Sequence, residues 1–174
     1  MTDASNKQRQ PPAGFTMLEL LLAIGLIGLL AGTSIPVVRT AVERITFNTA
    51  ARSVGAEIRA TRYAAVAKNR TLVLRFNCPD PGAYRMIEFT GIPAIDDAAD
   101  RCAETAYPYP DTTPGALPDA DGPIRRLPPG VTFSQAQTLT LNSSGRSAAA
   151  VTIEVANARQ RRAITVATSG RVAE

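Results

Sequence analysis

Residues 14–38 read GFTMLELLLAIGLIGLLAGTSIPVV, and this stretch decides how the chain is organised. Its last 24 residues, 15–38, carry a single charge, that of Glu19. At 1.5 Å per residue, a helix of this length reaches roughly 36 Å, which is enough to cross a membrane's hydrocarbon core. Pro36 is expected to kink or loosen the helix near its end, and Arg39 ends the apolar run. The stretch therefore predicts a transmembrane helix over residues 15–38.

The segment before this helix, residues 1–14, is polar and contains Lys7 and Arg9. Basic residues before a span favour a cytoplasmic location for that end of the chain. An ordinary secretory signal is the alternative interpretation, with cleavage near the small residues 31–33. The long apolar run and Glu19 argue against it, because a carboxylate inside a span costs about 2.5–3.5 kcal/mol and is by default a candidate functional group.

Gly14-Phe15-Thr16-Met17-Leu18-Glu19 resembles the prepilin cleavage and methylation motif of type IV pilins and type II secretion pseudopilins. The resemblance implies that a prepilin peptidase removes residues 1–14 as a leader and that the new N-terminus, Phe15, is methylated. Glu19 becomes the fifth mature residue, which in this family pairs with the N-terminal amine of a neighbouring subunit. Two buried charges would then neutralise each other in the filament core.

The composition excludes several classes of enzyme. The chain has no His, which removes the commonest general base and the commonest metal ligand. Hydrolases with Ser-His or Cys-His pairs and His-ligated metal sites are therefore excluded. A net charge of +4 does not by itself imply nucleic acid. We expect no enzymatic activity, no catalytic residues, no cofactor and no metal.

The only cysteines are Cys78 and Cys102, too few for a metal site. In an oxidising compartment they are expected to form a disulfide. Residues 91–130 hold eight of the 13 prolines and seven of the 15 acidic residues, so residues 91–126 are predicted to be an irregular surface insertion. A calcium site near Asp96, Asp97 and Asp100 is conceivable, but the spacing fits no ligand pattern, and a solvated acidic loop is the favoured interpretation.

After the span, residues 40–69 continue as a helical pattern. Six residues recur at spacings of four and three and define one apolar face: Phe47, Ala51, Val54, Ile58, Thr61 and Ala65. Arg52, Arg59 and Arg62 flank this face. They form either a basic patch for an acidic partner or, as we favour, a solvated flank whose stems cover the edge of the core.

Six or seven short strands follow. The runs that predict them are 71–76, 84–90, 131–133, 138–141, 151–155 and 163–167, with residues 169–172 closing the chain. A long helix followed by antiparallel strands predicts an α+β fold in which the amphipathic half of the helix, beyond the membrane half, packs on an antiparallel β-sheet. The domain after the span is predicted to cover residues 39–174.

Four further runs are similar to the GspH/FimT branch of pilin-like proteins: residues 60–70, 127–133, 142–146 and 169–172. The resemblance implies a pilin-like fold and a minor pseudopilin, a structural or initiating subunit of a type II secretion pseudopilus. The alternative is a FimT-like minor pilin of a type IV pilus. Either role implies other pilins, the peptidase and an inner-membrane assembly platform as partners, with the C-terminal domain in the periplasm.

Some FimT-like proteins are linked to DNA through a C-terminal Gly-Arg-x-Arg motif. This chain has Gly170-Arg171-Val172-Ala173 and lacks the second arginine. Arg159, Arg161 and Arg162 on the preceding hairpin could add phosphate contacts, for weak and salt-sensitive binding at most. Solvated hairpin charges are the favoured interpretation, and nucleic acid is not an expected partner.

Overall fold

A computed structural model describes residues 14–110 and 118–173 of the chain. The first helix, α1, comprises Met17–Lys68. The chain divides within this helix into two compact units, one ending at Glu43 and one beginning at Arg44. The predicted leader lies outside the described residues except for Gly14.

The first unit contains the apolar part of α1. This helix is long and apolar enough to cross a membrane. Its large apolar side chains from Phe15 to Val42 are exposed, and Phe15 itself is 85% exposed. A helix that presents apolar side chains all round requires an apolar environment. The structure thus confirms the predicted apolar helix, which is a candidate membrane anchor.

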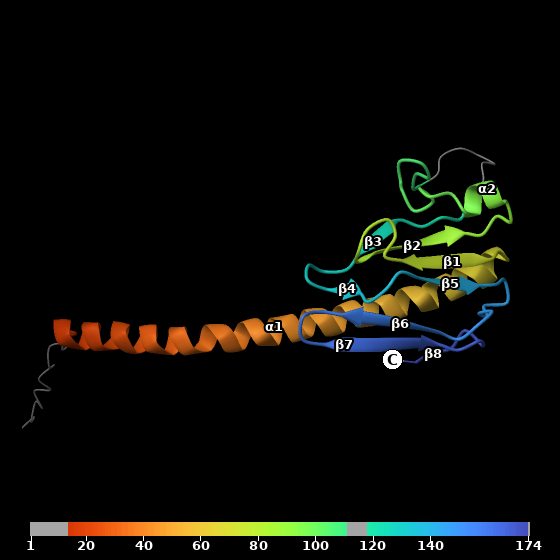
Figure 1. Ribbon diagram of the computed structural model, residues 1–174. Coiled ribbons are helices and arrows are strands. Elements are labelled where there is room, and N and C mark those ends of the chain that lie inside the picture. The colour runs from red at the N-terminus through yellow and green to blue at the C-terminus, as the bar shows by residue number, and fades with distance from the viewer. Residues whose placement is uncertain (1–13, 111–117, 174) are drawn as a thin grey trace, which may run out of the picture. The chain divides into compact units, whose positions relative to one another are not determined.

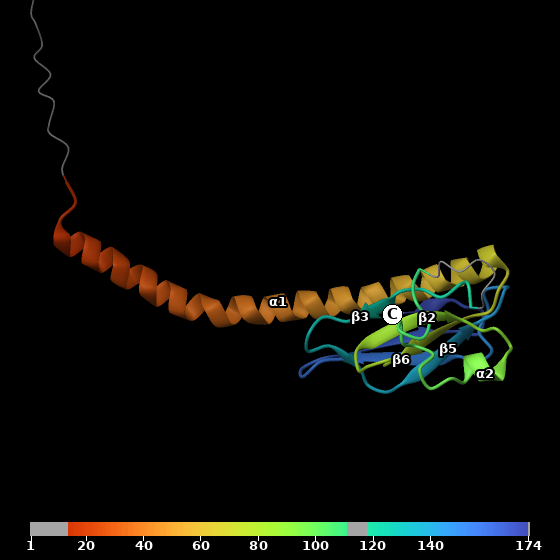
Figure 2. The same cartoon turned by 90° about the horizontal axis from the view of Figure 1, so that it is seen from above.

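In the second unit, residues 44–68 of α1 provide one face of the core. All six residues of the predicted stripe are buried, from Phe47 to Ala65. Four of them, Phe47, Val54, Ile58 and Ala65, belong to one hydrophobic cluster with side chains from the strands, including Leu74, Leu139 and Ile164. Figure 2 shows this part of α1 on one side of the strands and the short helix α2, Pro93–Asp96, on the other. The prediction of a helix packed on β-structure is confirmed.

Among the described residues, eight strands form two four-stranded antiparallel sheets, where the sequence predicted one sheet (Figure 1). The first sheet has the order β3-β2-β1-β5, and the second has the order β4-β6-β7-β8. The strands of the first sheet are β1 Leu72–Phe76, β2 Ala83–Glu88, β3 Ile124–Arg126 and β5 Gln137–Leu141. Those of the second are β4 Thr132–Phe133, β6 Val151–Ala156, β7 Arg161–Val166 and β8 Val172–Ala173.

Alternation along β1 and β2 assigns their side chains to two faces. Leu72, Leu74 and Phe76 face the core cluster shared with α1. Val73 lies opposite Ile87 in the register, and both are buried, although neither belongs to that cluster. Because successive side chains of a strand point to opposite faces, the outer face of this sheet is also covered.

Candidate functional site

The segment of the predicted cleavage motif forms the start of α1. Gly14 and Phe15 precede the helix and are exposed. Thr16 caps the helix, because its Oγ1 accepts a hydrogen bond of 3.2 Å from the backbone N–H of Glu19. Glu19 therefore lies in the first turn, where a negative charge is favoured by the helix dipole.

The spacing between Thr16 and Glu19 indicates a local role for the Glu19 side chain beside the predicted docking role. Thr16-Met17-Leu18-Glu19 has the Ser/Thr-x-x-Glu spacing of a capping box, in which the third residue of the helix supports the cap. The spacing alone could have predicted this cap from the sequence. An experiment on Glu19 must consequently separate its charge from its contribution to the helix start.

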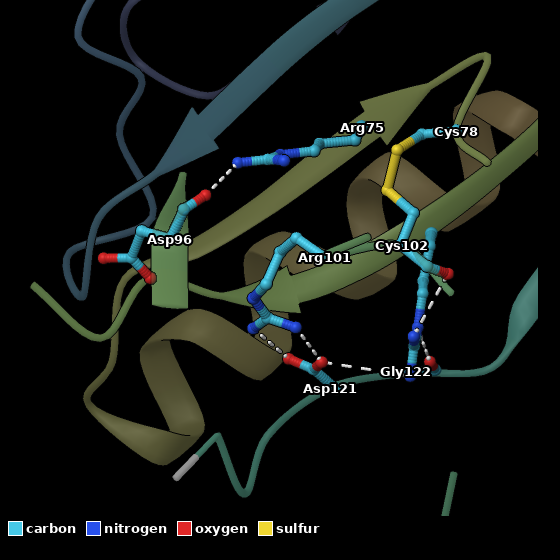
Figure 3. The surroundings of a disulfide bond; sticks show 8 residues. Arg75, Cys78, Asp96, Arg101, Cys102, Asp121 and Gly122 are labelled. Carbon is cyan, nitrogen blue, oxygen red and sulfur yellow. Dashed lines mark hydrogen bonds and ion pairs between the residues drawn. A yellow bond between two sulfur atoms is a disulfide. The ribbon is translucent and has the colours of Figure 1, made fainter. Parts of the chain in front are cut away.

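The predicted disulfide is present between Cys78 and Cys102. Their Cα atoms are 5.7 Å apart, within the normal range for a disulfide. Cys78 follows β1, and Cys102 lies in the insertion, so the bond connects the insertion to the end of a core strand (Figure 3). The cysteine pairing inferred from the sequence is thus confirmed.

In its described parts, 91–110 and 118–126, the insertion is largely irregular and exposed, as the sequence predicted, but it is also anchored to the first sheet. It contains the short helix α2 and ends in β3, which pairs with β2 from Ala83↔Arg126 to Arg85↔Ile124. Ala120 is buried and belongs to the core cluster. Proline and aspartate are depleted in regular structure, but a chain segment can still be ordered when buried side chains hold its backbone.

Arg85 is the central residue of this attachment. It lies in β2 on the outer face of the sheet and is fully buried. Its guanidinium donates hydrogen bonds to the carbonyl oxygens of Gly122 (2.8 Å), Cys102 (3.2 Å) and Tyr107 (2.6 Å). Burial lowers the pKa of Arg85 from its ordinary value, while the Asp121 carboxylate 3.8 Å away acts in the opposite direction.

A second arginine, Arg101, comes from the insertion itself and is also fully buried. Its guanidinium forms a two-pronged ion pair with Asp121, one bond measuring 2.8 Å, and donates to the Glu88 carbonyl at 3.0 Å. Figure 3 shows Arg101 and Asp121 directed at each other. The Arg101 Cζ atom also lies 4.5 Å from the centre of the Tyr107 ring, a cation–π distance.

The Glu88 carboxylate holds the return of the insertion to the sheet. One oxygen accepts hydrogen bonds from the backbone N–H groups of Asp119 (2.9 Å) and Ala120 (3.2 Å). The other oxygen forms an ion pair with Arg70. The hydrogen bond to Glu88 is the main reason that the pKa of Arg70 is raised. Arg85, Arg101 and Glu88 thus attach the described parts of the insertion to the first sheet.

The acidic residues at the start of the insertion behave differently from the prediction of a solvated loop. Asp97 and Asp100 are exposed, but Asp96 is only 6% exposed. Its carboxylate accepts hydrogen bonds from the backbone N–H groups of Thr90 (3.0 Å) and Gly91 (2.8 Å), so it closes a turn. Within residues 14–110 and 118–173, no group of side chains is arranged to hold a metal ion.

The four arginines named as candidate DNA contacts do not form one cluster. Arg159, Arg161 and Arg162 lie at the loop end of the β6–β7 hairpin, where Arg161 pairs with Glu154 at 3.6 Å. Arg171 lies beside Ala167 at the opposite end of β7. Six residues of strand separate the two ends by roughly 20 Å. The structure therefore does not bring Arg171 to the hairpin arginines.

A long N-terminal helix whose second half packs on antiparallel sheets, and which begins at a prepilin-type motif, defines a pilin-like protein. The model of a family described as "Type II transport protein GspH" matches residues 50–170, more than half of the chain. The chain therefore belongs to the GspH family. It is a minor pilin or pseudopilin of the type IV pilus and type II secretion class.

Two known proteins illustrate the similarity. The chain is 32% identical over 71 residues to the pilin-like protein PilA1 of Thermus thermophilus, a match that covers 41% of this chain and 44% of that protein. The crystal structure of the type IV minor pilin FimU of Pseudomonas aeruginosa superposes with a TM-score of 0.51 at 15% identity. That superposition covers 75% of this chain and 89% of the other. The second similarity concerns the fold alone.

Proposed function

We propose that the chain is a minor pseudopilin, a structural or initiating subunit of a type II secretion pseudopilus, and that it is not an enzyme. The GspH match over residues 50–170 is the observation that carries this proposal. The apolar first part of α1 supplies a single membrane anchor in the inner membrane, residues 15–38, with the N-terminus cytoplasmic and the later domain periplasmic. A disulfide in that domain fits an oxidising compartment.

Maturation is the first step of this function. A prepilin peptidase cleaves between Gly14 and Phe15, which are exposed ahead of the helix, and the Phe15 amine is then methylated. Mass spectrometry of the mature N-terminus in its own cells tests this step. We expect a chain that begins with N-methylated Phe15. A chain that begins near Thr33 would instead identify an ordinary secretory signal.

Docking through Glu19 is the second step. Its carboxylate pairs with the positive N-terminal amine of a neighbouring subunit inside the apolar filament core. An unpaired buried charge is strongly unfavourable, so this pairing selects the axial register of the subunits. The platform protein and other pilins are the partners that the mechanism requires. Because a subunit at the very tip has no subunit ahead of it, Glu19 places this chain below the tip.

Substitutions at Glu19 test the docking step. Glu19→Ala removes both the charge and the side chain that a capping box requires, whereas Glu19→Gln removes the charge but keeps a residue that suits a capping box. The bond from the Glu19 backbone N–H to the Thr16 Oγ1 is available in both variants. We expect both variants to insert and be cleaved normally, because neither process needs the carboxylate. Both should fail to enter the filament and should impair secretion.

The glutamine variant is the decisive one. If Glu19→Gln restores full secretion at native expression while Glu19→Ala does not, Glu19 serves the helix start and docking by charge is refuted. Secretion of exoproteins and surface piliation should be measured in the same deletion strain. Loss of piliation with intact secretion would assign the chain to a type IV pilus and overturn the choice of machine.

A further inference from the structure

Two tight turns of the second unit touch each other through glycines. Gly145 lies in the turn after β5, and Gly170 lies in the turn between β7 and β8. Both have positive φ angles, +72° and +76°. A Cβ atom on Gly170 would lie 2.0 Å from the carbonyl oxygen of Gly145, so only glycine allows this approach. The contact brings the following residues, Arg146 and Arg171, to the same end of the domain.

Helix α1 adds its own side chains to this end. The Arg62 Nε lies 3.1 Å from the Cβ position of Gly145 and 3.0 Å from that of Gly170, so the guanidinium stem covers both glycines. Val66 touches Gly145 in the same way, with its Cγ2 at 3.0 Å. The sequence predicted that Arg62 belongs to a solvated flank whose stems cover the edge of the core. In the structure Arg62 is half-buried, and its stem covers these two glycines.

Together these residues form a surface that we call the arginine–tyrosine patch, defined as Arg62, Tyr63, Val66, Arg146 and Arg171. Tyr63 is 71% exposed and Val66 is 51% exposed, one helical turn apart on α1. Among the described residues, none of the three guanidinium groups has an ion pair or a hydrogen bond. Elsewhere in this domain, Arg70, Arg101 and Arg161 all have carboxylate partners.

The chemistry of the patch favours a protein partner with carboxylates. Tyrosine and arginine are enriched at protein interfaces, and a planar guanidinium recognises a carboxylate through two bonds. Phosphate sites commonly use free backbone N–H groups, but those of these turns are occupied. The N–H groups of Ser144 and Arg146 donate to the Asn142 side chain, and those of Gly145 and Gly170 donate to carbonyl oxygens.

We infer that the arginine–tyrosine patch binds an acidic surface of a neighbouring pilin-like subunit in the same filament. The choice of this partner rests on the proposed function. The unpaired charges supply the complementarity, and Tyr63 and Val66, exposed on α1 next to Arg62, supply apolar contact. Opposite charges would select this neighbour over others, since like charges placed face to face are strongly unfavourable.

The test uses the full chain, expressed at native level in its own cells, with the photoreactive amino acid benzoylphenylalanine in place of Tyr63. The substitution keeps an aromatic ring at the position. We expect illumination to join the chain to a protein that carries its own prepilin-type motif, through an Asp- and Glu-rich peptide. The same photoreactive residue in place of Ala158, exposed at the far end of the β6–β7 hairpin, should not form that product.

A matched pair of double variants tests the charges. Arg146→Glu with Arg171→Glu reverses two exposed arginines of the patch, and Arg159→Glu with Arg161→Glu reverses two exposed arginines at the opposite end of the hairpin. Both change the net charge equally. We expect the first pair to lower the yield of the crosslinked product at least about tenfold and the second to leave it unchanged. Trypsin resistance of each variant checks that the domain is folded.

Four outcomes would overturn the inference: a product with nucleic acid, a product with a protein lacking the motif, equal losses in both double variants, or no product. In the last case, intact secretion by the same cells would show that the proposed function stands without this contact. If Glu19→Gln blocks entry into the filament, we expect it to abolish the crosslink as well, because the inferred contact forms inside the filament.

Discussion

Replacing Arg85 by methionine should detach the insertion from the first sheet. Methionine fills much of the space of the arginine stem but leaves the carbonyls of Gly122, Cys102 and Tyr107 without their donor. A hydrogen bond from a charged donor contributes roughly 1.5–3 kcal/mol, so three of them total roughly 4–9 kcal/mol. Relaxation of the carbonyls reduces this sum, and removal of one partner of a buried charged group typically costs about 3–5 kcal/mol.

Hydrogen exchange measured by mass spectrometry on the full chain in detergent micelles gives the local effect. The reporters are insertion amides such as Gly122, whose N–H donates to the Met86 carbonyl at 2.8 Å. At about 1.4 kcal/mol per tenfold change, a loss of ~3–5 kcal/mol accelerates their exchange roughly 150- to 5,000-fold. Amides of the β6–β7 hairpin should keep their protection, because they belong to the other sheet.

The matched control is Arg126→Met in β3. Arg126 pairs with Asp80 at 2.9 Å, but the two side chains are 61% and 58% exposed. Such a pair contributes at most about 1 kcal/mol, so the insertion should keep its protection in this variant. The assignment of Arg85 as the central attachment would be refuted by either of two results. The insertion amides of Arg85→Met could exchange at the wild-type rate, or their exchange could accelerate equally in Arg85→Met and Arg126→Met.

Two further predictions concern stability. Replacing Cys78 and Cys102 by serine opens a loop with a sequence separation of 24 residues and should lower the free energy of unfolding by about 3.5 kcal/mol on the chain-entropy relation. Urea unfolding in micelles measures this loss, and a loss below about 1 kcal/mol would contradict a structural role for the disulfide. Gly170→Ala should destabilise the chain by ~1–3 kcal/mol more than Gly91→Ala, because both have a φ of +76° but only Gly170 meets a neighbouring backbone atom. Equal melting temperatures for the two alanine variants would refute the glycine contact.

The sequence was most informative where one pattern had one structural meaning. The stripe from Phe47 to Ala65 has helical spacing over five steps, and every member is buried. Two cysteines allow one pairing, which the structure contains. The predicted alternating runs at β6 and β7 are strands in the structure, within one or two residues at their ends.

The sequence was least informative about which faces are covered. Alternation identifies strands but does not say how they are shared between sheets, so two sheets replaced the predicted one. Arginine is rarely fully buried, and nothing local marks Arg85 or Arg101 as exceptions. The consecutive apolar residues Leu72, Val73 and Leu74 were the available signal, because a strand with both faces buried loses its polar alternation.

The β2–β3 pairing also gives the insertion a particular place in the architecture. Since Ile124, the first residue of β3, lies opposite Arg85 of β2, the segment between these strands leaves and rejoins the sheet on neighbouring strands, as an elongated hairpin loop does. A designer could therefore replace residues 89–123, between β2 and β3, with a short turn without changing the order of any strand. The exchange would expose Val73 and Ile87 to water. It would also remove the carbonyl oxygens that accept hydrogen bonds from the Arg85 guanidinium. The length of this loop and the polarity of residues 73 and 87 must therefore change together. A shorter version of this domain needs polar side chains at both positions.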